Sequence, residues 1–255
     1  MMRFSAADLL RRKSARLILA AVIIASLVGY TYPLALTVPY VKDYWTYRYT
    51  ESIFIDGDLT CIFNANWSYY VVRSLGDVFI IKVNGTSRHR FSLRNGSWIS
   101  LSWNDTSWFT VNAKTRMYRS GYYTSWWIPQ NINLGDTIPV WNINARVVGL
   151  AWVMVNGRLL ECWILRYERP MEEYTFLYER TTGFFVKMIF KRVIGKSRIV
   201  AERIFVKASF NWPTLALMRP ILVLTAIATF LLLLFSYLES LKRLLRRRKE
   251  AAIII

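Results

Sequence analysis

The sequence predicts a mainly β extracytoplasmic domain, a curved antiparallel sheet or partly open barrel, flanked by two transmembrane α-helices. Long uncharged apolar runs lie near both ends, basic clusters lie outside those runs, and the middle is rich in aromatic and β-branched residues broken by turn sequences. The predicted segments are a basic N-terminus at 1–16, a first span at 17–41, a β domain at 42–212, a second span at 213–238 and a basic tail at 239–255.

Both apolar runs are long enough to cross a bilayer. Residues 17–41 carry no charged side chain, and neither do residues 220–238. About 20 apolar residues cover a hydrocarbon core of roughly 30 Å. Because backbone amides in lipid must be hydrogen-bonded internally, we expect both runs to be helices. A cleaved signal peptide is the alternative for the first run, although the run is longer than the usual apolar region of a signal.

Basic residues next to the spans predict that both termini are cytoplasmic. Lys and Arg close to span ends orient a membrane protein, whereas long loops cross largely regardless of their charge. The same basic residues explain much of the net charge of +18, since they attract anionic lipid head groups beside a span. We therefore expect a lipid membrane, and no nucleic acid, as the partner of these charges. They are Arg3, Arg11, Arg12, Lys13 and Arg16 before the first span, and Lys242, Arg243, Arg246, Arg247, Arg248 and Lys249 after the second.

The middle of the chain is predicted to form about eight to eleven strands in one all-β domain, with a two-sheet sandwich as the alternative. Short runs of Val, Ile, Thr and aromatic residues between turn signals are typical of strands. Residues 120–145 are less regular and are predicted to connect two meanders. The predicted turns are Asn84-Gly85, Asn95-Gly96 and Asn104-Asp105 in the first meander, and Asn156-Gly157, Pro170, 181–183 and Gly195-Lys196 in the second.

The predicted extracytoplasmic location suggests roles for the two cysteines and for the N-glycosylation sequons. Cys61 and Cys162 are the only cysteines, and a pair in an oxidising compartment favours a disulfide. Two buried free thiols are the alternative. Four Asn-X-Ser/Thr sequons within the same segment predict a glycoprotein, in a host with N-glycosylation machinery. The four acceptors are Asn66, Asn84, Asn95 and Asn104.

A succession of short motifs across residues 45–207 resembles a known family. The pattern is similar to uncharacterised archaeal membrane-anchored extracytoplasmic β-domain proteins, and distantly to lipoprotein-carrier half-barrels, in which a curved antiparallel sheet wraps an apolar cavity. The carriers are soluble or lipid-anchored, so the resemblance does not imply lipid shuttling by a two-pass chain. The motifs are Trp126-Trp127-Ile128-Pro129, Leu134-Gly135-Asp136, Gly157-Arg158, Glu161-Cys162-Trp163 and Tyr178-Glu179-Arg180-Thr181-Thr182-Gly183.

No pattern in the sequence predicts catalysis, a cofactor or a metal. His89 is the only histidine, which leaves no recognisable zinc set with two cysteines a long way apart. The acid pairs Asp56/Asp58 and Glu172/Glu173 stand next to predicted turns, where acids are common. No nucleophile elbow, phosphate loop or dinucleotide fingerprint is present. We therefore expect a protein that is not an enzyme.

The aromatic pair Trp126 and Trp127 is the candidate site of ligand or partner contact, because two adjacent indoles in a predicted loop are hard to bury on one face.

The leading hypothesis is a two-pass membrane protein whose β domain is a binding or scaffolding module in a cell-envelope or membrane assembly. Its partner would be a membrane protein or a second copy of this chain. The alternative is a lipid or other apolar ligand bound in the concave face of the β domain.

Overall fold

The computed structural model describes residues 19–26, 42–93, 95–209 and 214–252. The chain divides into two compact units, a helical unit of Met1–Tyr32 with Met218–Ile255 and a β unit of Pro33–Leu217.

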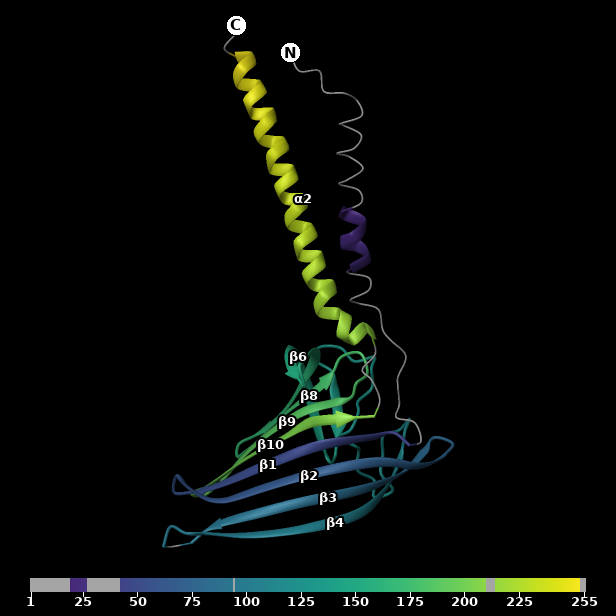
Figure 1. The fold of residues 1–255 in the computed structure, drawn as a ribbon, viewed down its shortest axis with the longest axis vertical. Helices are drawn as coiled ribbons and strands as arrows, with labels where there is room; N and C mark the ends of the chain where they lie inside the picture. Colours follow the sequence, from purple (N-terminus) through teal and green to yellow (C-terminus); the bar gives the residue numbers. More distant parts are fainter. Residues whose placement is uncertain (1–18, 27–41, 94, 210–213, 253–255) are drawn as a thin grey trace. The chain divides into compact units, whose positions relative to one another are not determined.

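The ten strands that the structure describes belong to one antiparallel sheet (Figure 1). Their order is β4-β3-β2-β1-β10-β9-β8-β7-β6-β5, so the first and last strands pair and join two meanders. The predicted mainly β fold is confirmed as a single sheet rather than a sandwich. The strands are β1 (Tyr44–Ile55), β2 (Asp58–Leu75), β3 (Val78–Ser92), β4 (Trp98–Asn112), β5 (Thr137–Val140), β6 (Ile143–Val155), β7 (Arg158–Arg169), β8 (Glu172–Glu179), β9 (Phe185–Ile194) and β10 (Ser197–Ala208).

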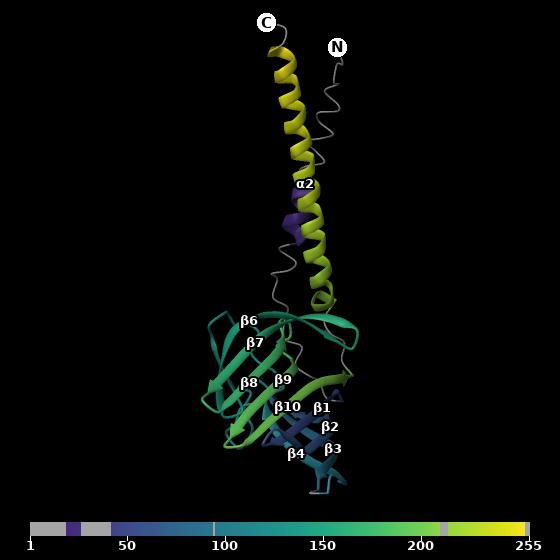
Figure 2. The same cartoon turned by 90° about the vertical axis from the view of Figure 1, so that its left-hand side faces the viewer.

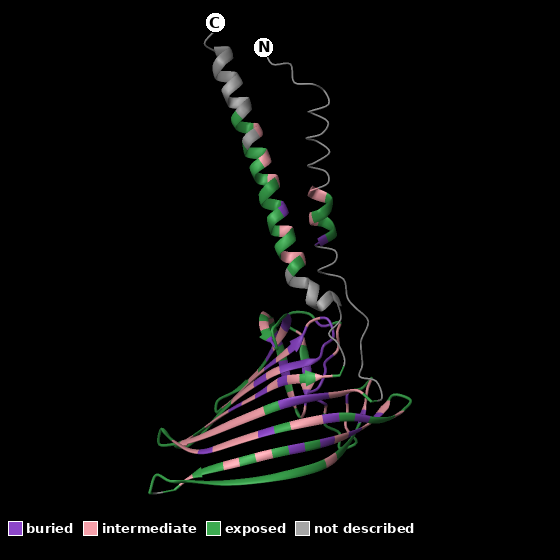
Figure 3. Cartoon of the chain, viewed as in Figure 1, coloured by how far each residue is buried: buried purple, intermediate pink, exposed green. Residues whose placement is uncertain are grey.

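The sheet curls, and its two faces differ (Figure 2). Side chains from β1–β4 and from β8–β10 line one shared cavity, which defines the inner face. Burial alternates along many strands, as Figure 3 shows, because successive side chains point to opposite faces. Tyr47, Val71, Ile81 and Phe176 are fully or almost fully buried on the inner side. The opposite side is called the outer face.

Turn prediction succeeded in the second meander and partly failed in the first. Asn156 and Gly157 both have positive φ, 51° and 74°, and join β6 to β7 as predicted. Asn84-Gly85 and Asn104-Asp105, however, lie inside β3 and β4, so these two predicted turns are wrong. A Cβ on Gly85 would lie 2.8 Å from Cδ1 of Trp67. Gly85 therefore makes room for an indole on the next strand, rather than for a turn.

The connection between β4 and β5, residues 113–136, packs into the inner face. Trp126 and Trp127 are only 2% and 3% exposed. Arg116 anchors the connection, because its Nε donates to the carbonyl oxygen of Trp127 at 2.8 Å and its Nη2 donates to that of Pro139 at 2.8 Å. Burial lowers the pKa of Arg116, and these carbonyls satisfy the guanidinium. Part of the segment predicted as a loop at 120–145 forms β5 and the start of β6.

The turn between β8 and β9 holds this connection in place. The buried carboxylate of Glu179 accepts hydrogen bonds from the backbone N–H groups of Thr181 and Thr182, each at 2.7 Å. Gly183, with φ of +69°, accepts a hydrogen bond from the N–H of Ile128 at 2.9 Å. A Cβ on Gly183 would lie 2.4 Å from the carbonyl oxygen of Ile128. The turn at residues 181–183 therefore holds the connection at Ile128, and its third position requires glycine.

The helical unit contains a helix at residues 19–26 and α2 (Thr214–Ala252). The rest of the predicted first span at 17–41 lies outside the described residues. Within the part of the chain that the structure describes, α2 alone is long and apolar enough to cross a membrane, over Ile221–Lys242. The helix continues beyond residue 238 through most of the basic segment.

Replacement of Gly183 by alanine should destabilise the β unit strongly. A positive φ costs an L-residue about 1–2 kcal/mol, and the contact with Ile128 adds a further ~1–3 kcal/mol of overpacking. Gly195→Ala is the matched control, since Gly195 also has a positive φ, +56°, but a Cβ there meets nothing within 4 Å. Thermal unfolding of the full-length protein in detergent compares the two variants. Equal losses would contradict this role of the Gly183–Ile128 contact.

Candidate functional site

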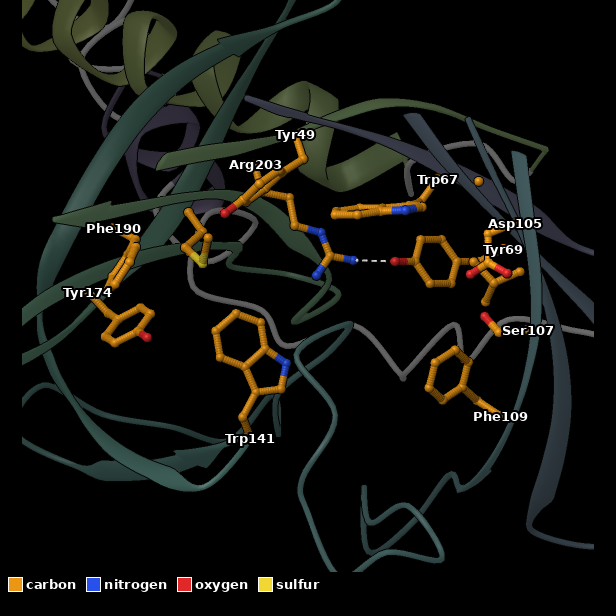
Figure 4. Close-up of a pocket in the computed structure, with 13 residues that line it drawn as sticks. Tyr49, Trp67, Tyr69, Asp105, Ser107, Phe109, Trp141, Tyr174, Phe190 and Arg203 are labelled. Atoms are coloured by element: carbon orange, nitrogen blue, oxygen red, sulfur yellow. Dashed lines mark hydrogen bonds between the residues drawn. The ribbon is translucent and has the colours of Figure 1, made fainter. Parts of the chain in front are cut away.

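The inner face encloses a cavity of about 450 Å³ between the two halves of the sheet (Figure 4). This volume lies within the range of roughly 300–1,000 Å³ found for small-molecule sites. The lining is mostly aromatic, with a few polar groups. It comprises Tyr49, Trp67, Tyr69, Val83, Gly85, Asp105, Ser107, Phe109, Trp141, Tyr174, Met188, Phe190 and Arg203.

A second cavity of about 440 Å³ adjoins the first. Tyr118, Tyr122 and Trp126, from the connection between β4 and β5, line only this second space. The residues common to both cavities are Tyr69, Phe109, Trp141 and Arg203. Arg203 therefore lies at the boundary of two aromatic hollows.

Arg203 is a buried cation surrounded by rings. It belongs to β10, is 7% exposed and pairs with Tyr49 of β1. Its Nη2 donates to the hydroxyl of Tyr69 at 3.0 Å, whereas its Nε has no hydrogen-bond partner among the described residues. The guanidinium carbon lies 4.3 Å from the ring centre of Tyr47 and 5.2 Å from that of Phe185. Cation–π attraction of this kind is worth about 0.5–2 kcal/mol per contact.

No carboxylate among the described residues forms an ion pair with Arg203 within 4.0 Å. Burial raises the pKa of Tyr47, Tyr69 and Tyr178, so these neighbouring phenols stay neutral near pH 7. Asp105 also lines the first cavity but is exposed on the edge strand β4. The cavity boundary therefore carries a positive charge with no carboxylate of the described residues paired to it within 4.0 Å.

An exposed apolar strip extends the inner face beyond the cavity, along the far halves of β3 and β4. Its members are 38–54% exposed, and Phe91 pairs with Ile99 across the two strands. We call Phe91, Ile99, Leu101 and Trp103 the inner apolar strip. His89 lies beside it, with its ring centre 4.1 Å from that of Phe63 and 4.5 Å from that of Trp103. The imidazole is therefore part of an aromatic surface.

The structure buries Trp126 and Trp127, which the sequence placed in a predicted loop. The curl of the sheet provides an inner face that covers both indoles. Their role as ligand or partner contacts stays a prediction. Trp126 packs against the rings of Trp45, Tyr69 and Tyr118, with ring centres 5.0–5.5 Å apart. Its remaining surface borders the second cavity. Trp126 thus contributes to the site as a wall.

The predicted disulfide between Cys61 and Cys162 is also corrected, since both are free thiols. Cys61 lies on β2 and Cys162 on β7, and four strands, β1, β10, β9 and β8, separate them in the sheet. A disulfide needs Cα atoms within about 7 Å, whereas neighbouring strands alone are about 4.8 Å apart. Burial raises the pKa of both thiols.

Three of the sequon acceptors, Asn66, Asn84 and Asn104, lie on the outer face of β2, β3 and β4 and are exposed. The sequons align across the strands. Asn66, Thr86 and Asn104 form one cross-strand row, and Ser68, Asn84 and Thr106 form the next. Asn95 is exposed at the turn between β3 and β4. All four acceptors therefore point away from the cavity or lie at a turn.

The acid pairs noted in the sequence do not converge in the cavity. Asp56 forms an ion pair with Lys196 at 3.2 Å, and Glu173 forms one with Lys191 at 3.2 Å, both near turns. Over residues 19–26, 42–93, 95–209 and 214–252 there is no cluster of metal-binding side chains.

Sequence reasoning missed Arg203. In β10 the residues two positions before and after it are Ala201 and Phe205, which are 1% and 4% exposed. The other face of the strand is also mainly apolar and carries Glu202, so alternation alone does not show which face is buried.

Three solved structures show limited likeness to this chain. A protein from Bacteroides fragilis, described as exported and with a YmcC-like fold, is 12% identical over 69% of this chain and 100% of its own, with a TM-score of 0.31. A protein from Parabacteroides distasonis described as a lipoprotein is 10% identical over 67% of this chain and 96% of its own, with a TM-score of 0.30. An S-type phycobiliprotein lyase from Guillardia theta is 11% identical over 64% of this chain and 87% of its own, with a TM-score of 0.25.

These similarities are too low to bear on function, and they lend no support to the archaeal part of the resemblance. No protein-family model and no curated protein matches the chain.

In a host with N-glycosylation machinery, expression should give a heavier protein whose mass falls on treatment with a peptide-N-glycosidase. The reason is that the outer-face acceptors are exposed and would be lumenal under the predicted topology. Replacing Asn66, Asn84, Asn95 and Asn104 by glutamine one at a time should remove the added mass stepwise. A fully expressed, membrane-inserted protein without any glycan would argue against the extracytoplasmic location.

Proposed function

We propose that this chain is a membrane-anchored protein, not an enzyme, whose β domain binds a lipid or other apolar ligand on its inner face. The observation that carries the proposal is the unfilled aromatic cavity of about 450 Å³. A core of this kind is normally packed without voids larger than a water molecule, and an apolar hollow with a few polar groups is the usual form of a ligand site.

The inner apolar strip supports the same function. Leu101 and Trp103 are 54% and 44% exposed on the face that also lines the cavity. Covering apolar surface stabilises a complex by about 25 cal/mol per Å². A ligand with a long apolar chain would fill the cavity and continue over the strip, so that both surfaces leave water together.

The anchor gives this site access to lipid. The proposed topology keeps both termini in the cytoplasm and the β domain outside, with α2 crossing the bilayer over Ile221–Lys242. Only residues 209–220 separate β10 from that segment. So short a tether restricts the domain to the membrane surface, where apolar molecules concentrate.

A scaffolding role in a membrane assembly is the second candidate, and a separate surface favours it. Alternate residues of β6, namely Val148, Leu150, Trp152 and Met154, are 41–61% exposed. A membrane-protein partner or a second copy of this chain would cover such a surface. The two roles predict different molecules bound to the purified chain. Scaffolding predicts a protein partner, and ligand binding predicts a lipid.

Filling the cavity should abolish ligand binding without unfolding the domain. Ser107 lines the cavity from the edge strand β4, so the indole of Ser107→Trp would occupy the space. Thr110→Trp is the control, because Thr110 is exposed on the same strand and faces outward. Binding of an environment-sensitive fluorescent acyl probe should fall at least about tenfold in the first variant only. Equal binding by both variants would place the probe elsewhere and remove the proposal.

A further inference from the structure

We infer that the ligand is an anionic amphiphile, an acidic head group on an apolar chain, and that Arg203 binds the head. This inference rests on the proposed function and adds the chemistry of the ligand. An ionised group buried without a partner is costly, and buried charges in proteins are normally paired. Arg203 is 7% exposed and has no acidic partner among the described residues.

Arg116 shows how this fold satisfies a buried arginine that has only a structural role. It is 5% exposed, and its nitrogens donate to the carbonyl oxygens of Trp127, Pro139 and Thr124. Arg203 has no such carbonyls. Two hydroxyls, those of Tyr69 and Ser125, accept from its Nη atoms, and its Nε is unpartnered. Its hydrogen-bonding capacity is therefore only partly used.

The position of Arg203 suits a head-group anchor. It lies at the boundary of both cavities, and the ring of Trp141 faces the same space (Figure 4). The planar guanidinium can pair with two oxygens of a carboxylate or phosphate at once. The phenols of Tyr47 and Tyr69 remain neutral because burial raises their pKa, so neither supplies an anion that pairs with the guanidinium.

The chain of such a ligand would lie along the inner face, toward the inner apolar strip. One cross-strand row of the sheet runs from Arg203 through Tyr49, Ala65 and Ser87 to Trp103. Four steps between neighbouring strands span roughly 19 Å along the sheet, a distance that suits a long acyl chain. A head group at Arg203 and a tail toward Trp103 would thus use both the charge and the inner apolar strip.

The acidic head group has two sources, the carboxylate of a fatty acid and the phosphate of a phospholipid. Full-length protein in nanodiscs of neutral lipid is exposed to three photoreactive probes with the same alkyl chain, which end in a carboxylate, a phosphate or an alcohol. The pH is set so that the fatty acid is ionised. Cross-links are mapped by mass spectrometry. We expect the acidic probes to label inner-face peptides at least about tenfold more than the alcohol.

Variants of Arg203 assign the preference to the guanidinium. Arg203→Met and Arg203→Gln should reduce acid labelling to the level of the alcohol, whereas Arg203→Lys should retain part of it. Arg198→Met is the control, since Arg198 is exposed on the same strand. Thermal unfolding of the ligand-free protein is a second readout. Removal of an unpaired buried charge should leave the melting temperature unchanged or higher, whereas a purely structural arginine would lower it.

The outcomes separate the two proposals. A preference for either acid supports the inference, and the preferred acid names the source of the head group. Equal inner-face labelling by acids and alcohol, or an acid preference that survives Arg203→Gln, overturns the inference but leaves the proposed function standing. No inner-face labelling by any probe overturns the proposed function itself. If Arg203→Met fails to fold, the comparison of Arg203→Gln with Arg203→Lys decides.

Discussion

Side chains fill the inner face of the sheet only in part, and both the packing of the domain and its proposed site follow from this. The side chains of the strands leave cavities along this face. The connection at 113–136 fills one part with Trp126 and Trp127, and the contact between Gly183 and Ile128 fixes its position. The part that the connection does not reach stays hollow, and the two cavities lie there.

Three buried charged residues differ in how fully the domain satisfies their hydrogen-bonding groups. Glu179 is saturated by the N–H and hydroxyl groups of its own turn, and Arg116 by backbone carbonyls. Both have a structural role that the chain satisfies itself. Arg203 is held by two hydroxyls and several rings, next to empty space. Departures from full satisfaction are expected at functional sites, and the proposed head-group anchor is such a departure.

Local patterns in the sequence predict much of this fold, and the failures have tertiary causes. Asn156-Gly157 forms its turn with open space around Gly157, whereas the pattern at Gly85 is overridden by Trp67 on a neighbouring strand. The separation of Cys61 from Cys162 depends on strand order, which spacing does not reveal. The burial of Trp126 and Trp127 depends on the curl of the sheet. Arg203 was not predictable, because both faces of β10 are mainly apolar in the sequence and only the structure shows which one is buried.

Native mass spectrometry of the full-length protein, extracted gently from its own membrane, is the sharpest test of ligand binding at Arg203. We expect a stoichiometric adduct of lipid mass, which on release ionises as a carboxylic or phosphoric acid. Protein that arrives with an empty β domain and a bound protein partner would contradict ligand binding and favour the scaffolding role. A bound neutral lipid would retain the cavity as a binding site but contradict the assignment of Arg203.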